Sequence, residues 1–178
     1  DLTEVKQSSR LAEKCAAYQN REVDKVVSYM EDMAQGVLDE SLQVDAGDAD
    51  TVEAKNNFDR VKNAVESLRE GLADKANVAE AISKGDLSKE VRLASDKDLL
   101  GKSLLAMVEA IQNLVHDANF LSTAAVEGNL DARADAQRHQ GDFRKVVQGV
   151  NDTLDAVVTP LNEAAEVLEA AANRDLTQ

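Results

Sequence analysis

The sequence predicts an all-α protein made of long helices that pack as coiled coils. Of its 178 residues, 43% are apolar but only 3% are aromatic, so most buried surface must come from small and aliphatic side chains. The chain has one Pro, and the helix-favouring residues Ala, Glu, Lys and Leu are abundant. Apolar residues also recur at alternating steps of four and three, which is the spacing of a coiled-coil seam.

A repeat of about 45 residues organises the chain. Four strings, MAQGVL, ISKGDL, AVEGNL and AANRDL, each place a Leu two residues after a Gly or, in the last string, after an Arg. These leucines are Leu38, Leu87, Leu130 and Leu176, at spacings of 49, 43 and 46 residues. Each unit is therefore expected to end one helix, cross a connector and begin the next helix.

The first two helices precede Gly36 and Gly85. Apolar spacing predicts the second of them from Phe58 to Ile82. Lys75 falls on its seam, where it either marks a change of register or extends its charged end to solvent.

The third and fourth helices have the clearest seams. Apolar residues at steps of four and three predict a helix over 98–127 and another that begins near Phe143. Pro160 lies inside the fourth helical stretch and lacks a backbone N–H, so it should kink the helix or begin a new one there.

The connectors are too long for tight hairpins. From each repeat Leu to the next helix they span roughly 10–15 residues, and an extended chain covers about 3.3 Å per residue. A connector can therefore run back along the first helix, so that the next helix begins at a similar level and points the same way. Two parallel helices and a connector make half a bundle, which a second chain would complete.

The segment 85–102 is the most informative connector. Gly85 should end the second helix, and the isolated hydrophobes Val91 and Leu93 are candidates to dock back into the bundle. Asp98 is placed to cap the third helix, because a carboxylate there accepts from free N–H groups and suits the helix dipole.

This order of elements resembles a HAMP domain, the relay module of bacterial chemoreceptors, sensor histidine kinases and adenylyl cyclases. In the unit at 70–117 the matching residues are Gly85, Asp86, Leu87, Val91, Leu93, Asp98 and Gly101, with Leu99 in place of the usual Glu. In the first unit they are Gly36, Leu38, Leu42 and Val44. In the third they are Gly128, Leu130 and Gly141, with connector hydrophobes reduced to Ala134 and Ala136. The stretch 149–178, Pro160 included, is similar to HAMP arrays of methyl-accepting chemotaxis proteins.

The resemblance implies a poly-HAMP array: parallel homodimeric four-helix coiled-coil bundles, stacked end to end through continuous helices. The expected divisions are a lead-in helix at 1–22, a divergent unit at 23–69, a unit at 70–117, a unit with a divergent connector at 118–159, and the first helix of a truncated fourth unit at 160–178.

The implied function is an intracellular relay in a bacterial chemoreceptor, which passes conformational signals from an input domain to a kinase-control output domain by switching bundle packing. The implied partners are a second copy of the chain, the flanking domains and, indirectly, a chemotaxis histidine kinase and its coupling protein. Three alternatives stay open: a relay of a sensor histidine kinase, a passive dimeric coiled-coil spacer, and a monomeric bundle that binds a small ligand.

Composition argues against several other classes. A formal charge of −14 repels phosphate backbones and anionic lipids, so neither nucleic acid nor a membrane surface is an expected partner. No apolar run approaches the roughly 20 residues that span a bilayer, and the N-terminus has no signal-peptide pattern. The sequence therefore predicts a cytoplasmic segment.

Catalysis has no support in the sequence. No phosphate-binding loop, nucleophile elbow or kinase motif is present, so we expect no enzyme activity and no cofactor. Neither of the two histidines belongs to the Glu-x-x-His pattern of a di-iron bundle, and DAGDAD lacks the ligand spacing of a calcium loop. His116 and His139 are both expected at the surface.

Overall fold

The computed structural model describes residues 2–175, and the side chains of residues 2–172. Helices account for all of its regular secondary structure, and these residues form no strand. The all-α fold class is therefore confirmed. The elements are α1 (Leu2–Ala34), α2 (Val52–Ser83), α3 (Leu99–Val126), the short 3-10 helix η1 (Ala136–Arg138) and α4 (Gly141–Asp175).

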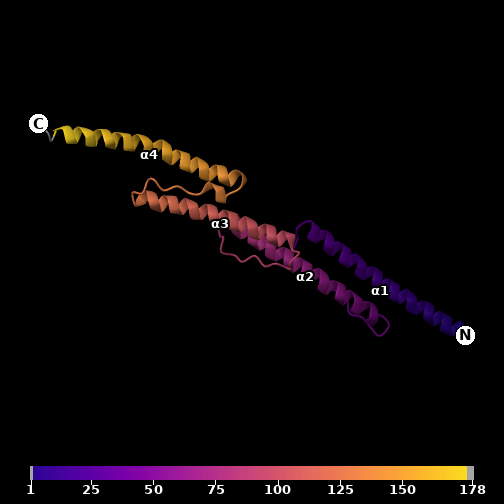
Figure 1. Ribbon diagram of the computed structural model, residues 1–178. Coiled ribbons are helices and arrows are strands. Elements are labelled where there is room, and N and C mark those ends of the chain that lie inside the picture. The colour runs from indigo at the N-terminus through magenta and orange to yellow at the C-terminus, as the bar shows by residue number, and fades with distance from the viewer. Residues whose placement is uncertain (1, 176–178) are drawn as a thin grey trace. The chain divides into compact units, whose positions relative to one another are not determined.

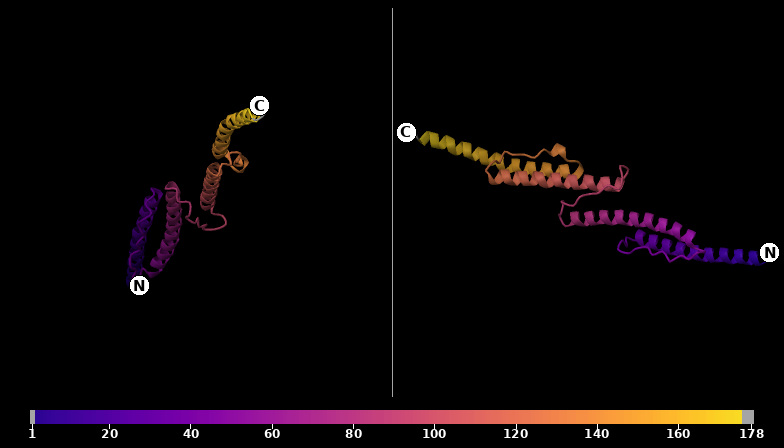
Figure 2. Two further views of the ribbon diagram at one scale, coloured as in Figure 1. Left: turned by 90° about the vertical axis from the view of Figure 1, so that its left-hand side faces the viewer. Right: turned by 90° about the horizontal axis from the view of Figure 1, so that it is seen from below.

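The chain forms two compact units, Asp1–Gly101 and Lys102–Gln178. Within the first unit α1 and α2 point the same way, and the segment between them runs back along the pair (Figure 1, Figure 2). The second unit repeats this arrangement with α3 and α4. Each unit thus has the parallel helices and returning connector that the connector lengths predict.

Three glycines end helices in the same way. Gly36, Gly85 and Gly128 have φ values of 92°, 80° and 81°, a left-handed conformation that strains residues with a Cβ. After each glycine the next N–H bonds back into the last helical turn; for example, the Asp86 N–H donates to the Ala81 carbonyl at 2.9 Å. This pattern supplies hydrogen bonds to carbonyl groups that would otherwise be unpaired at a helix end, so these three glycines end their helices.

Helix α4 continues through Pro160 without a break. Of the two alternatives for Pro160, the start of a new helix is therefore wrong, and Figure 2 shows α4 bending along its length. A Pro removes one backbone hydrogen bond, which neighbouring turns of a long helix can tolerate as a bend. Leu176, the fourth repeat leucine, lies outside the described residues.

Each unit has a small apolar core where helices and connector meet. In the first unit the core consists of Tyr29, Met33 and Leu42, with Val26, Leu38, Val65 and Leu72 packed against them. In the second it consists of Leu121, Ala134, Ala136 and Val147, with Leu114 and Leu154 packed against them.

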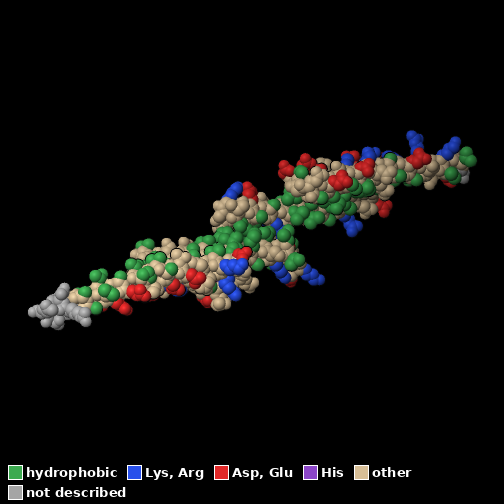
Figure 3. All heavy atoms as spheres, turned by 90° about the horizontal axis from the view of Figure 1, so that it is seen from above, with side chains coloured by type: hydrophobic (Ala, Val, Ile, Leu, Met, Phe, Trp, Pro, Cys, Tyr) green, Lys and Arg blue, Asp and Glu red, His purple; other side chains and the backbone are tan. Residues whose placement is uncertain are grey.

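Many seam residues are exposed to solvent in the single chain. Figure 3 shows hydrophobic side chains exposed along both units. In α4, Leu161 and Leu168 are 54% and 70% exposed, and every described side chain from 161 to 172 is exposed. A helix with a seam but no partner leaves apolar area in water. None of the described helices is both long and apolar enough to cross a membrane.

Candidate functional site

The residues singled out by the sequence gather in three segments between successive helices. We name them connector 1 (35–51), connector 2 (84–98) and connector 3 (127–140). In each, two hydrophobic positions lie four and six residues after the repeat Leu, so the segments can be compared position by position. These pairs are Leu42 and Val44, Val91 and Leu93, and Ala134 and Ala136.

Connector 1 is held against α2 at Leu42, the first of its two hydrophobic positions. Leu42 is buried at 3% exposure, and its N–H donates to the Glu66 carboxylate of α2 at 2.6 Å. Arg69 donates to the same carboxylate at 2.9 Å and to the Leu38 carbonyl at 3.0 Å. Burial works to raise the pKa of Glu66, but the Leu42 amide and Arg69 outweigh it and lower that pKa. Val44 is half-buried.

The middle of connector 1, at Asp45, is bound to α1. Lys25 Nζ lies 2.5 Å from Asp45 Oδ1, and this hydrogen bond lowers the pKa of Asp45. The Tyr18 hydroxyl donates to the Asp45 carbonyl at 2.8 Å. Glu22, which is 1% exposed, pairs with Lys25 at 3.1 Å and accepts from the Asp45 N–H at 3.3 Å. These contacts hold connector 1 against α1 at Asp45, and Lys14 continues the attachment at Asp48 and Asp50.

Connector 2 keeps its hydrophobes closer to solvent. Val91 is half-buried and Leu93 is 42% exposed. Leu93 nevertheless lies over Gly101 in the first turn of α3, where an added Cβ would come within 2.8 Å of Leu93 Cδ2. A glycine is therefore required at this position for the connector to approach the helix closely.

Asp98 caps α3 and also binds α2. Its carboxylate accepts from the N–H groups of Ala94 and Gly101, both at 2.9 Å, and lies 3.0 Å from Lys75 Nζ. The two backbone amides, followed by Lys75, lower the pKa of Asp98 to about 2. Lys75 is buried, so of the two alternatives given for it, extension of its charged end to solvent is wrong. Burial is tolerated because the ammonium group has an anionic partner.

Asp86 has a local role at the start of connector 2. It is exposed, and its carboxylate accepts from the Ser88 hydroxyl at 2.6 Å and the Ser88 N–H at 2.9 Å. These bonds lower the pKa of Asp86 and stabilise the turn that follows Gly85. Leu87 is half-buried, whereas Leu130 of connector 3 is 37% exposed.

Connector 3 is packed closely although its hydrophobes are small. Ala134 and Ala136 are both buried in the core of the second unit. The Asn151 side chain of α4 accepts from the Ala134 N–H at 3.1 Å and donates to the Ala134 carbonyl at 2.8 Å. Asn151 is itself buried, so one amide side chain satisfies both backbone groups of a buried residue.

His139 was expected at the surface, and that expectation is wrong. It is 3% exposed, and its Nε2 lies 2.7 Å from Oδ2 of Asp117, a buried residue of α3. His116, one residue before Asp117, is exposed as expected. Adjacent helix positions differ by about 100°, so His116 turns outward while Asp117 faces the connector.

A contact between two ionisable side chains joins helix and connector in all three repeats. A residue 12 or 13 positions before the repeat Leu contacts a residue 7 to 11 positions after it. The pairs are Lys25 with Asp45, Lys75 with Asp98, and Asp117 with His139. In the third pair the helix supplies the anion, so its polarity is reversed.

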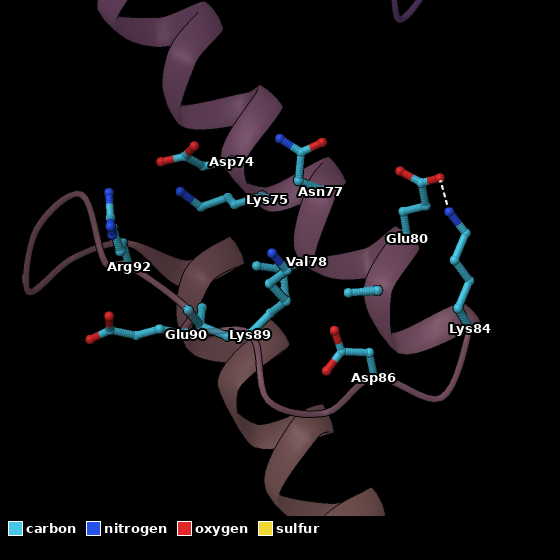
Figure 4. Close-up of a pocket in the computed structure, with 12 residues that line it drawn as sticks. Asp74, Lys75, Asn77, Val78, Glu80, Lys84, Asp86, Lys89, Glu90 and Arg92 are labelled. Atoms are coloured by element: carbon cyan, nitrogen blue, oxygen red, sulfur yellow. Dashed lines mark hydrogen bonds and ion pairs between the residues drawn. The ribbon is translucent and has the colours of Figure 1, made fainter.

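A groove of about 560 Å³ lies between α2 and connector 2 (Figure 4). Both charge signs point into it, and Lys84 and Glu80 form an ion pair across part of its edge. Most of its lining residues are charged and both signs are equally represented, so it offers no net charge complementary to an anionic or a cationic ligand. Its lining residues include Asp74, Lys75, Asn77, Glu80, Lys84, Asp86, Lys89, Glu90 and Arg92.

Sequence reasoning missed Glu66 and Asn151, which bind the backbone of connector 1 and connector 3 at Leu42 and Ala134. Each follows a seam residue directly, Val65 and Val150 respectively. A polar residue beside an apolar seam is the available signal, but most such residues face solvent. Among the described residues no group of His, Cys, Asp and Glu side chains is arranged to hold a metal ion.

Comparison with known proteins adds one finding. The family model of the HAMP domain matches residues 138–178, which run from the end of η1 through α4. No curated protein and no solved structure matches the chain significantly. The match supports a HAMP-containing signalling protein, and a HAMP domain relays signals in sensors and chemoreceptors rather than carrying out catalysis.

Proposed function

We propose that the chain is a cytoplasmic signal relay of a bacterial chemoreceptor, built from successive HAMP units along the whole sequence. In this proposal two copies associate in parallel, and each unit becomes a four-helix bundle. The units pass changes of packing from an input domain to an output domain that acts on a chemotaxis histidine kinase and its coupling protein.

The observation that carries the proposal is the repeated half-bundle. Both compact units have two parallel helices with a connector running back between their ends, and the HAMP match falls on the last of these segments. Exposed seam residues in α3 and α4, such as Leu100, Met107 and Val157, supply the apolar surface that a second chain would cover. Aligned seams of this kind favour parallel association.

Bundle packing suits a relay because the seam residues are mostly small or β-branched. Layers of Ala and Val can repack at low cost, and a two-state element transmits a signal when its states differ by only a few kcal/mol. A sensor histidine kinase would use the same relay, and a passive dimeric spacer would use the same helices without a switch.

Disulfide cross-linking tests the parallel dimer. In a Cys15→Ser background, Leu104→Cys should form a cross-link between two chains, because Leu104 lies on the seam of α3 and meets its equivalent in a parallel pair. The matched control is Glu109→Cys, which is exposed and lies off the seam. Cross-links typical of antiparallel chains, or a monomer by light scattering, would overturn the proposal.

A further inference from the structure

The third ion pair differs from the other two in its chemistry. Lys25 with Asp45 and Lys75 with Asp98 each join a lysine to an aspartate, residue types whose ordinary titration lies outside pH 5 to 8. The pair of Asp117 and His139 contains the one kind of side chain whose ordinary titration falls between pH 5 and 8. Connector 3 is therefore the segment whose attachment depends on a group that can change charge near neutrality.

We propose that His139 and Asp117 form a proton-dependent latch, which holds connector 3 more tightly against α3 when the imidazole is protonated. His139 is 3% exposed and Nε2 lies 2.7 Å from Asp117 Oδ2, so the contact is sheltered from solvent. An ionised carboxylate can only accept a hydrogen bond, so Nε2 carries the hydrogen and Nδ1 is the atom that gains or loses the proton.

The charged groups around His139 come from three elements. Asp117 of α3 supplies a negative charge, with Oδ2 at 2.7 Å from His139 Nε2. Arg138 of η1 lies 3.9 Å from the other Asp117 oxygen, and its side chain is largely exposed. Arg144 of α4 donates to the His139 backbone carbonyl at 2.9 Å, so its charge is directed at the main chain. The carboxylate thus contacts the ring directly, whereas the two arginines contact Asp117 and the His139 main chain.

Proton uptake converts a neutral donor into a charged one. A hydrogen bond between two charged groups is stronger than one with a neutral partner, by an amount that corresponds to about a fivefold change in equilibrium. Loss of the proton leaves the hydrogen bond in place but weakens it. Both residues belong to one chain, so the latch operates whether or not the chain relays signals.

Hydrogen exchange at the amides of Arg138 and His139 measures the latch. These N–H groups bond to the Asp135 and Ala136 carbonyls and are released only when η1 opens. After correction for the intrinsic rate, protection in the unmodified chain should be about fivefold higher at pH 6 than at pH 8. The Leu42 amide, bound by a carboxylate, is the internal reference and should change little.

The chain offers a matched pair of variants, since His116 and His139 are its two histidines. His139→Gln should abolish the difference between pH 6 and pH 8, whereas His116→Gln should retain it. Asp117→Asn, which keeps an acceptor but removes the charge, should also abolish it and serves if His139→Gln fails to fold. Equal or lower protection at pH 6 in the unmodified chain, or a difference that survives His139→Gln, would overturn the latch.

Discussion

Connector 2 and connector 3 attach to their helices by different means. Connector 2 carries the larger hydrophobes, yet Val91 is only half-buried and Leu93 remains 42% exposed. Connector 3 carries only Ala134 and Ala136, and both are buried. Small side chains let the backbone of connector 3 lie close to the helices, so polar side chains can bind that backbone directly.

In the second unit, α4 supplies the polar side chain that binds connector 3, and the sequence has no equivalent for connector 2. Asn151 lies 21 residues after Leu130 and binds both backbone groups of Ala134. The residue 21 positions after Leu87 is Val108, whose side chain has no hydrogen-bonding group. Connector 3 is therefore anchored at its hydrophobes by an amide side chain, whereas connector 2 is anchored at its end by Asp98 and leaves Val91 and Leu93 for apolar contact, which a second chain would complete under the proposed dimer.

The sharpest test of this difference replaces Val91 and Leu93 together by Asp. If both dock in a dimer, each replacement should cost about 1.5–3 kcal/mol of stability, because a buried apolar side chain is lost. Thermal melting of the dimer measures the loss, and Arg92→Asp, an exposed change between the two positions, is the control. Unchanged melting would favour a passive spacer in which connector 2 contributes nothing.

Removing the anchor of connector 3 should have the next largest effect. Asn151→Ala leaves a buried N–H and a buried carbonyl of Ala134 without partners, at about 1–3 kcal/mol for each group. Urea unfolding measures the change. Gln148→Ala on the same helix is the control, because Gln148 is exposed and bonds only locally to Asp152 at 2.8 Å. Equal midpoints for the two variants would show that Asn151 is no anchor.

Connector 2 has its own point of close approach, which Gly101→Ala tests. The new Cβ would lie 2.6 Å from Asp98 Oδ2 and 2.8 Å from Leu93 Cδ2, so overpacking should cost about 1–3 kcal/mol. Gly149→Ala is the matched control, since no atom lies within 4 Å of its Cβ and Ala favours a helix by up to about 1 kcal/mol. Denaturant midpoints should therefore move in opposite directions, and a shared direction would contradict this reading of Gly101.

The helices and their ends follow from the sequence because local chemistry determines them. Gly36, Gly85 and Gly128 adopt the left-handed conformation that stops a helix, and the seam alone predicted α3 to within a residue at each end. Asp98 caps α3 as its position indicates, because a cap needs only the next few residues.

The attachments of the connectors could not be predicted in the same way. Glu66, Asn151 and His139 act across the space between elements, on residues 24, 17 and 22 positions away. Their roles depend on how far each connector runs back along the helices, and no local pattern gives that distance. His139 was therefore expected at the surface of its connector, and that expectation was wrong.

The smallest expected effect is a change in how stability depends on acid pH, which tests whether Asp98 holds the end of connector 2. The pKa of Asp98 is about 2, because two backbone amides and Lys75 favour its ionised form, whereas an unfolded Asp titrates near 3.9. A carboxyl whose folded pKa is depressed contributes stability that is present above about pH 4 and is lost as the pH falls toward 2.

Asp98→Asn removes this contribution, so the variant should be less stable than the unmodified chain at pH 7 but should lose less stability between pH 4 and pH 2. Urea midpoints measured across that range, with the exposed Asp39→Asn as the control, provide the comparison. Parallel pH profiles for Asp98→Asn and the unmodified chain would mean that the cap and the Lys75 pair do not act in the folded state, and connector 2 would then be held to α3 by the contact of Leu93 with Gly101 alone.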